Sequence, residues 1–280
     1  MRTIAQRAFA RATSAACSGP SWRVTTDASA AHVAASQFYT GLVAELYDPL
    51  VSYRATADEY AGFLDHSGPP ALELGCGSGA PLLDLVARGY DVEGLDASAD
   101  MLALCRARAA ARGLRVVLHE QEMQSMALPR RYRAIFLAGA SFTLLASDAD
   151  AHAALARVHE HLLPGGAALI PLTLADPAAP PFGGAREARA PDGASLRVTV
   201  LAAHVDAARG ATRTRLRYER IARDGRCETL VREIATRHWP QPVFRRMLED
   251  AGFARITAVD PRGGRASADA ALFAFLAQRA

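Results

Sequence analysis

Three alternating glycines end a short apolar run at residues 71–79, which read Ala-Leu-Glu-Leu-Gly-Cys-Gly-Ser-Gly. Glycine at positions 75, 77 and 79 lets the backbone turn tightly and approach a ligand closely, because no Cβ stands in the way. A helical pattern follows directly, and the start of a helix offers unpaired backbone N–H groups. The stretch therefore predicts a strand, a tight turn and a helix that hold a ligand with a nucleoside-like shape.

Short apolar runs alternate with amphipathic helical patterns along most of the chain. This alternation is typical of a parallel sheet covered by helices on both faces. The expected strands cover residues 71–74, 92–95, 116–118, 134–138, 167–172, 255–259 and 271–276, and the expected helices 81–88, 98–112, 149–162 and 242–251. The pattern predicts an α/β fold, a Rossmann-like, doubly wound and mostly parallel sheet of seven strands.

Residues 176–239 differ in character from their surroundings. A stretch rich in Pro, Gly and Ala at 175–193 predicts a loop, and three β-patterned runs follow at 195–204, 212–221 and 228–238. We therefore expect an inserted antiparallel sheet of three strands that serves as a substrate-binding part or lid. The Rossmann-like core takes residues 67–175 and 240–280, and helical patterns at 31–66 predict an N-terminal cap.

The first 26 residues carry four arginines and no acid, a composition that resembles an organellar transit peptide. The alternative is a disordered basic tail, which we expect over residues 1–30. The formal net charge of +3 is too small and too scattered to favour nucleic acid as a partner. No apolar run approaches the ~20 residues that cross a bilayer. We expect a cytoplasmic protein that binds neither nucleic acid nor membrane.

Three histidines at 152, 159 and 161 raise the question of a metal site. On a helix His152 and His159 share a face, whereas His161 points away and no nearby carboxylate completes a ligand set. We expect no metal.

Two classes of cofactor use a glycine turn of this kind. Gly75, Gly77 and Ala80 satisfy the dinucleotide fingerprint G-x-G-x-x-[GA], with Asp96 as the acid that binds a ribose. Against a nicotinamide, Glu73 stands where dehydrogenases usually present an apolar residue, and the motif begins only after about 70 residues of mostly helical sequence.

Three further motifs, taken together, resemble the class I S-adenosylmethionine-dependent methyltransferases. In that family E-x-G-x-G-x-G ends the first strand, G-x-D-x-S-x-x-M-L ends the second, and a D-M pair follows the third. Here residues 73–79 read Glu-Leu-Gly-Cys-Gly-Ser-Gly, residues 94–102 read Gly-Leu-Asp-Ala-Ser-Ala-Asp-Met-Leu, and Glu122-Met123 follows the third strand. The resemblance covers about residues 36–280.

The resemblance implies S-adenosylmethionine as the cofactor. Asp96 would accept hydrogen bonds from the ribose hydroxyls, Glu122 would accept from the adenine amino group, and Met101 and Met123 would lie against the ring faces. The family usually has Asp at position 122, so the longer Glu is a departure. The cofactor contacts implied are Tyr47, Glu73, Gly75, Gly77, Gly79, Asp96, Ala97, Met101, Glu122, Met123 and Ala138.

A narrower resemblance lies upstream, at residues 38–48. There Phe-Tyr-Thr-Gly-Leu-Val-Ala-Glu-Leu-Tyr-Asp is similar to the amino-terminal segment of antibiotic-pathway methyltransferases, which include N,N-dimethyltransferases of macrolide amino sugars. The resemblance implies that this segment closes over the cofactor, with Tyr47 on S-adenosylmethionine and Tyr39 facing the acceptor. It also implies acceptor contacts from Ser141, Phe142 and Trp239.

Some amino-sugar enzymes of that group place a basic histidine where this chain has Leu144. Tyr39 and His238 are therefore the candidates for a catalytic base. We expect methyl transfer to a small secondary metabolite, with nitrogen as the acceptor atom and O- or C-methylation as the nearest alternative. More remote alternatives are a nicotinamide-dependent oxidoreductase and a non-catalytic S-adenosylmethionine-binding module. A homodimer is one candidate oligomer.

Overall fold

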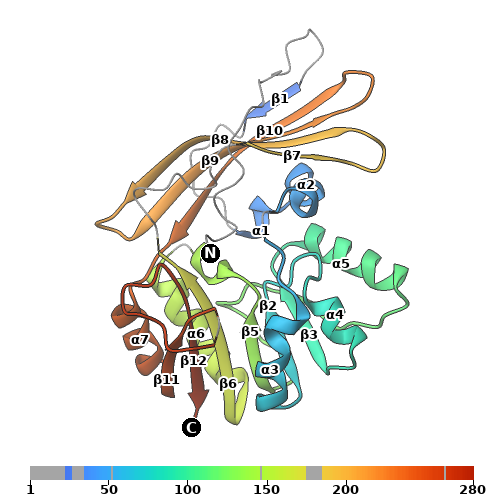
Figure 1. Ribbon diagram of the computed structural model, residues 1–280. Helices are drawn as coiled ribbons and strands as arrows, with labels where there is room; N and C mark the ends of the chain where they lie inside the picture. The colour runs from blue at the N-terminus through green and yellow to red at the C-terminus, as the bar shows by residue number, and fades with distance from the viewer. Residues whose placement is uncertain (1–22, 27–34, 52, 146, 175–184, 262) are drawn as a thin grey trace, which may run out of the picture.

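The computed structural model describes residues 35–51, 53–145, 147–174, 185–261 and 263–280, together with the backbone of 23–26. These residues form two sheets, with a short helical cap between them (Figure 1). Most of the predicted tail and part of the predicted loop at 175–193 lie outside the described residues.

The larger sheet has seven strands in the order β11-β12-β6-β5-β2-β3-β4. β12 runs antiparallel to both of its neighbours, and the other pairings are parallel. The doubly wound, mostly parallel sheet expected from the sequence is therefore confirmed. Its strands are β2 (Ala71–Leu74), β3 (Val92–Asp96), β4 (Leu118–Glu120), β5 (Tyr132–Leu137), β6 (Leu162–Thr173), β11 (Phe253–Val259) and β12 (Leu272–Arg279).

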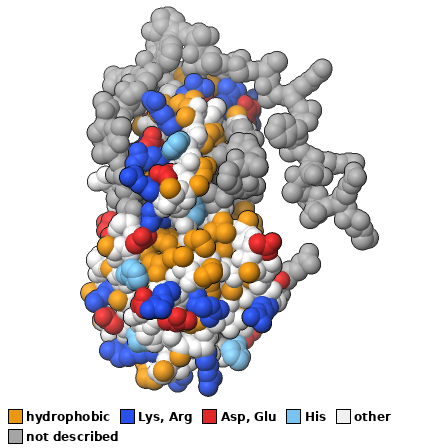
Figure 2. Space-filling model, turned by 90° about the vertical axis from the view of Figure 1, so that its left-hand side faces the viewer, with side chains coloured by type: hydrophobic (Ala, Val, Ile, Leu, Met, Phe, Trp, Pro, Cys, Tyr) orange, Lys and Arg blue, Asp and Glu red, His pale blue; other side chains and the backbone are white. Residues whose placement is uncertain are grey.

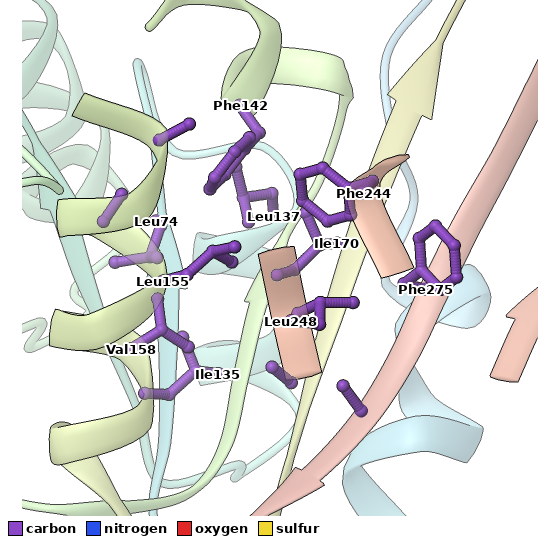
Figure 3. Close-up of a cluster of buried hydrophobic side chains, with 14 of the residues drawn as sticks. Leu74, Ile135, Leu137, Phe142, Leu155, Val158, Ile170, Phe244, Leu248 and Phe275 are labelled. Carbon is purple, nitrogen blue, oxygen red and sulfur yellow. The ribbon is translucent and has the colours of Figure 1, made fainter. Parts of the chain in front are cut away.

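Helices cover both faces of this sheet. On one face α3 (Ala57–Ser67), α4 (Leu82–Ala87) and α5 (Ala99–Ala111) bury one hydrophobic cluster. On the other, α6 (Asp148–His161) and α7 (Gln241–Asp250) bury a second cluster, part of which is drawn in Figure 3. Residues 57–66, expected to belong to the cap, form most of α3, which packs with α4 against the core sheet.

The smaller sheet has five strands in the order β1-β10-β9-β8-β7, where three were expected. β8 (Ser195–Asp206), β9 (Ala211–Ile221) and β10 (Cys227–Arg237) form the expected antiparallel set. β7 (Arg186–Arg189) adds an antiparallel edge strand inside the predicted loop, and β1 (Arg23–Thr26) pairs in parallel with β10 from inside the predicted tail. Neither segment has the alternating apolar pattern of a strand, because each lies at an edge of the sheet.

The cap consists of α1 (Ala35–Phe38) and α2 (Leu42–Leu50), and it lies between the two sheets (Figure 1). Its apolar side chains Phe38, Leu42 and Leu46 pack with Leu216 and Ile234 of the smaller sheet in a third hydrophobic cluster. Polar contacts, described below, join the cap to the larger sheet. The cap is therefore the layer through which the two sheets meet.

Among the described residues, no helix combines the length and the apolar character that crossing a membrane requires. Figure 2 shows the side of the molecule that lies to the left in Figure 1, where hydrophobic side chains gather at mid-height above a group of charged ones. Val243 of α7 and Leu272 of β12 are two of the large hydrophobic residues that stay about half exposed.

Candidate active site

Two adjoining cavities lie beside the glycine turn that follows β2. The smaller, of about 290 Å³, is lined by the end of β3, by residues 121–124 and by the cap. The larger, of about 550 Å³, is lined by the turn, by the 3₁₀ helix η2 (Ala140–Leu144) and by β9 and β10 of the smaller sheet. The residues that line both cavities are Tyr39, Tyr47, Gly75, Gly77, Ser141 and Leu144. The cavities therefore meet where the cap, the glycine turn and η2 come together.

The glycines of the turn serve two different purposes. Gly75 and Gly77 line both cavities with φ of 68° and 51°, and a Cβ on Gly77 would lie 3.2 Å from Met101 Cε. Gly79 has φ of 98° and lines neither cavity. A Cβ there would lie 2.8 Å from both Cys105 Sγ and Leu83 Cγ. Gly79 therefore lets the following helices pack together, which is a different role from the cofactor contact expected.

Asp96 ends β3 and lines the smaller cavity. Its Oδ2 accepts a hydrogen bond from the Gly77 backbone N–H and its Oδ1 from that of Ser98, both at 2.8 Å. Burial raises the pKa of this carboxyl, although the backbone N–H groups oppose the shift. Each oxygen keeps a lone pair, so Asp96 can still accept hydrogen bonds from a ligand. Ala97 and Met101 line the same cavity, as expected.

Glu122 and Met123 also line the smaller cavity, opposite the glycine turn. The Glu122 carboxylate accepts hydrogen bonds from Gln124 Nε2 at 2.8 Å and from Ser36 Oγ of the cap at 3.3 Å. The lining of this cavity thus includes the carboxylates of Asp96, Glu122 and Asp150 together with the apolar side chains of Met101 and Met123.

Glu73 lies behind the turn and lines neither cavity. It is fully buried, and neither of its carboxylate oxygens has a hydrogen-bond partner among the residues that the structure describes. Burial, together with the nearby Asp96, raises the pKa of Glu73 well above its usual value. Glu73 is consequently harder to ionise than an exposed glutamate, and it does not line either cavity.

Tyr39 and Tyr47 lie edge to face, with ring centroids 5.6 Å apart, at the junction of the cavities. Burial raises the pKa of both phenols, and the carboxylate of Asp48 raises the pKa of Tyr47 further. A phenol that resists ionisation can donate or accept a hydrogen bond but is a poor base. This geometry fits Tyr39 as an orienting group.

His238 lines the larger cavity at the end of β10. Its Nδ1 lies 2.8 Å from the backbone carbonyl oxygen of Thr173, and its Nε2 lies 3.1 Å from the hydroxyls of Thr212 and Thr236. All three threonines also line the cavity. The sequence pointed to His238 but gave no indication of these partners.

Phe142 and Trp239, both expected to contact the acceptor, lie in the hydrophobic core instead. Phe142 is fully buried and Trp239 is 3% exposed, their ring centroids are 5.7 Å apart, and neither lines a cavity. Figure 3 shows Phe142 among Leu137 and Phe244. The indole N–H of Trp239 is already used, because it donates to Asp148 at 2.9 Å. Neither side chain has a surface that a substrate could contact, so we do not include Phe142 and Trp239 in the candidate site.

Ser141, expected to contact the acceptor, lines both cavities, whereas Ala138, expected to contact the cofactor, lines only the larger one. Several lining residues were missed by the sequence analysis. Those with hydroxyl or amide side chains include Ser36, Gln121, Gln124, Thr143, Thr173, Thr212, Thr214 and Thr236. A two-residue spacing, which places both members of a pair on one face of a strand, was an available signal for Thr212 with Thr214 and for Thr236 with His238.

Polar contacts tie the cap to the larger sheet around these cavities. The backbone N–H of Gly41 donates to Asp100 Oδ2 at 2.6 Å, and Ser98 Oγ donates to the Tyr39 carbonyl oxygen at 2.6 Å. Asp48 of α2 accepts a hydrogen bond from Ser78 and pairs with Arg108 of α5. The cap is therefore held against both the glycine turn and the helix after β3.

No group of three or more His, Cys, Asp and Glu side chains in the described part of the chain is arranged to hold a metal ion. His161 instead donates from Nδ1 to the Arg157 carbonyl oxygen and accepts at Nε2 from the Leu128 N–H, at 2.7 and 3.0 Å. His159 packs edge-on against Phe253. Both of these histidines have structural contacts.

Residues 71–166 match a protein-family model described as a methyltransferase domain. Two curated relatives are similar in sequence. One is the dTDP-3-amino-3,6-dideoxy-alpha-D-glucopyranose N,N-dimethyltransferase of Streptomyces fradiae, 36% identical over 47% of this chain and 53% of that protein. The other is the dTDP-3-amino-3,4,6-trideoxy-alpha-D-glucopyranose N,N-dimethyltransferase of Streptomyces venezuelae, 31% identical over 44% and 54%. The chain thus spans about half the length of the curated relatives it matches.

Solved structures share the fold over nearly their whole length. An S-adenosylmethionine-dependent methyltransferase from Clostridium acetobutylicum has a TM-score of 0.66 at 17% identity, covering 84% of this chain and 97% of that one. An amino pentose methyltransferase from Micromonospora echinaspora, solved with S-adenosylmethionine bound, has a TM-score of 0.63 at 22% identity, covering 86% and 98%.

Proposed function

We propose that this chain, whose residues 71–166 form a methyltransferase domain, transfers a methyl group from S-adenosylmethionine to a nitrogen atom of a small secondary metabolite. The observation that carries the proposal is the meeting of two cavities at a shared lining of six residues. One cavity has the groups that a nucleoside needs, and the other opens between the cap and the inserted sheet. A donor and an acceptor could therefore meet at that junction.

The smaller cavity fits S-adenosylmethionine in the chemistry of its lining. Asp96 and Glu122 offer carboxylate oxygens for the ribose hydroxyls and the adenine amino group, and Met101 and Met123 offer apolar surface for the ring. Gly77 leaves space that a Cβ would fill, 3.2 Å from Met101 Cε. The cofactor, when bound, supplies a methyl group already activated on a sulfonium.

The protein's own contribution is to hold the acceptor and to keep water away. The cap and η2 enclose the junction, and Tyr39 can orient the acceptor through a neutral phenol. Such proximity and desolvation can supply about 7 kcal/mol of the barrier for well-oriented partners. The side chain of Leu144 is not a base, so we assign proton acceptance to His238, which lines the same cavity.

Nitrogen is favoured because both curated relatives are named as N,N-dimethyltransferases of amino sugars. An amine needs only to arrive unprotonated, whereas a phenol or a carbon nucleophile depends more strongly on a base. O- or C-methylation of a similar metabolite is the alternative. We also propose a cytoplasmic location and, from the hydrophobic area in Figure 2, a homodimer.

Calorimetry with S-adenosylhomocysteine and with NAD tests the cofactor, and we expect binding of the first alone. Transfer of labelled methyl to dTDP-3-amino-3,6-dideoxy-α-D-glucopyranose, compared with the sugar that carries a hydroxyl in place of that amine, then tests the acceptor atom. Label on the amine alone supports N-methylation. Tight NAD binding without S-adenosylhomocysteine binding contradicts the cofactor assignment, and cofactor binding without transfer to amine or hydroxyl acceptors favours the binding module.

A further inference from the structure

The imidazole of His238 is held in one tautomer by its surroundings. The Thr173 carbonyl oxygen, 2.8 Å from Nδ1, can only accept a hydrogen bond, so Nδ1 must carry the proton. The neutral ring therefore has its lone pair on Nε2. The backbone N–H of His238 also donates to the Gly210 carbonyl oxygen at 2.7 Å, which fixes the residue beside β9.

Two threonine hydroxyls lie at the lone pair. Thr212 of β9 and Thr236 of β10 are directly opposite each other in the strand register, and each Oγ1 is 3.1 Å from Nε2. Nε2 has a single lone pair, so one hydroxyl can donate to it in line while the other keeps its proton for another partner. Because both threonines line the larger cavity, that partner can be the acceptor molecule.

The other ionisable side chains that line this cavity are poorly suited to receive a proton. Asp48 and Arg54 pair with each other at 2.9 Å, and Tyr53 donates its hydroxyl to Glu59. Burial raises the pKa of Tyr39, Tyr47 and the Cys76 thiol, so these groups stay neutral. If the acceptor molecule transfers a proton to a side chain of this cavity, the imidazole of His238 is therefore the group that receives it.

We propose that Thr212 and Thr236 relay the proton of the methylated nitrogen to His238. This inference rests on the proposed function. The nitrogen lone pair forms the bond to the methyl carbon, and the pair of the broken carbon–sulfur bond stays on sulfur. The N–H proton then passes to a threonine Oγ1, whose own proton moves to Nε2. The imidazolium that results keeps its Nδ1–H on the Thr173 carbonyl oxygen.

The relay makes the threonines positioning and proton-passing groups whose hydroxyls matter more than their shape. Valine has nearly the same shape and lacks the hydroxyl, whereas serine keeps the hydroxyl. The test therefore compares Thr212→Val/Thr236→Val, Thr212→Ser/Thr236→Ser and His238→Gln with the unaltered enzyme. Thr199→Val is the matched control, because Thr199 alternates with the inward-facing Val198 and Val200 and so lies on the other face of the sheet.

Each variant is assayed for kcat and KM with the amine sugar used above, or with whichever amine the unaltered enzyme methylates, and for S-adenosylhomocysteine affinity. We expect the double valine variant and His238→Gln to lose at least tenfold in kcat with KM and cofactor affinity within about twofold. The double serine variant should recover most of the rate, and Thr199→Val should keep it. Nitrogen-15 NMR of the histidine ring should show His238 as the Nδ1–H tautomer in the unaltered protein, assigned by its loss in His238→Gln.

If the double valine variant keeps the kcat of the unaltered enzyme while His238→Gln loses it, the relay is overturned, because His238 would then take the proton directly. Full kcat in His238→Gln, or an Nε2–H tautomer of His238, would overturn it as well. These outcomes leave the proposed function intact. Failure of the unaltered enzyme to bind S-adenosylhomocysteine or to methylate any amine contradicts the proposed function itself.

Discussion

The hydroxyl of Ser78 donates a hydrogen bond of 2.9 Å to the carboxylate of Asp48, which joins the glycine turn to the cap helix α2. Asp48 also pairs with Arg54 at 2.9 Å and with Arg108 at 2.5 Å, and its side chain is only 11% exposed. The two residues are 30 positions apart in the chain. Through this contact the part of the site that would hold the cofactor is coupled to the part that covers it.

Asp48→Ala should loosen the cap over the site. The substitution removes the carboxylate that pairs with Arg54 and Arg108 and accepts from Ser78. We expect the free energy of unfolding to fall by about 1–3 kcal/mol. This is less than the cost of breaking a fully buried ion pair, because Arg54 and Arg108 are partly exposed. Weaker binding of S-adenosylhomocysteine should accompany it. Urea unfolding and calorimetry measure the two effects. Asp58→Ala removes an exposed pair with Arg88 and should change neither, and equal behaviour of the two variants would contradict the coupling.

Asp96→Ala should weaken S-adenosylhomocysteine binding by about 1–3 kcal/mol, the cost typical of losing hydrogen bonds to a charged group. Calorimetry gives this difference directly. Glu120→Ala is the matched control, because Glu120 is exposed at the end of the neighbouring strand and lines neither cavity. Unchanged affinity in Asp96→Ala would remove Asp96 from the cofactor site.

Tyr39→Phe should lower turnover more than it lowers cofactor affinity. The phenol lies at the junction of the cavities and remains neutral, so its removal takes away a hydrogen bond to the acceptor but little surface. Steady-state kinetics measures the change in turnover, and calorimetry with S-adenosylhomocysteine measures the change in cofactor affinity. A variant with the rate of the unaltered enzyme would mean that Tyr39 only packs against Phe38 and Tyr47.

Gly79→Ala should destabilise the fold more than Gly89→Ala does. Both glycines have positive φ, 98° and 87°, so both changes carry a backbone cost of about 1–2 kcal/mol. Only at position 79 would the new Cβ also press on Cys105 Sγ and Leu83 Cγ, which adds about 1–3 kcal/mol of overpacking. Urea unfolding of the two variants measures the difference. Equal losses would show that the helices adjust around the extra carbon.

Glu73→Gln should stabilise the ligand-free protein at neutral pH. Burial raises the pKa of Glu73 above its value of 4.5 in the unfolded chain, so between these two pKa values the folded state binds more protons than the unfolded state. Stability of the unaltered protein therefore falls as pH rises through that window, and glutamine removes the loss. Thermal unfolding from pH 4 to pH 8 should give matching curves for the two proteins at the acid end and a growing advantage for Glu73→Gln above it. A variant that is less stable at every pH would contradict a raised pKa of Glu73 in the folded protein.

The half of the site that would bind the cofactor was predictable from the chain. Gly75 follows β2, Asp96 ends β3 and Glu122 follows β4; these strands are parallel, so their carboxyl ends lie at one edge of the sheet. Short motifs at the ends of strands were therefore enough to predict that these residues lie in one site. The seven-stranded sheet followed from the same alternation of apolar runs and helices.

Tertiary structure alone decided the half that would bind the acceptor. Thr173, Thr212, Thr236 and His238 come from β6, β9, β10 and the end of the insertion, and apart from the two-residue spacing of Thr236 and His238 no spacing in the sequence links them. Trp239 directly follows His238 and yet belongs to the core, because neighbours in an extended chain point to opposite sides and packing determines which side meets the cavity. The type and order of the residues therefore determined the half of the site that would bind the cofactor. The register of the antiparallel strands β9 and β10 determined which side chains line the half that would bind the acceptor.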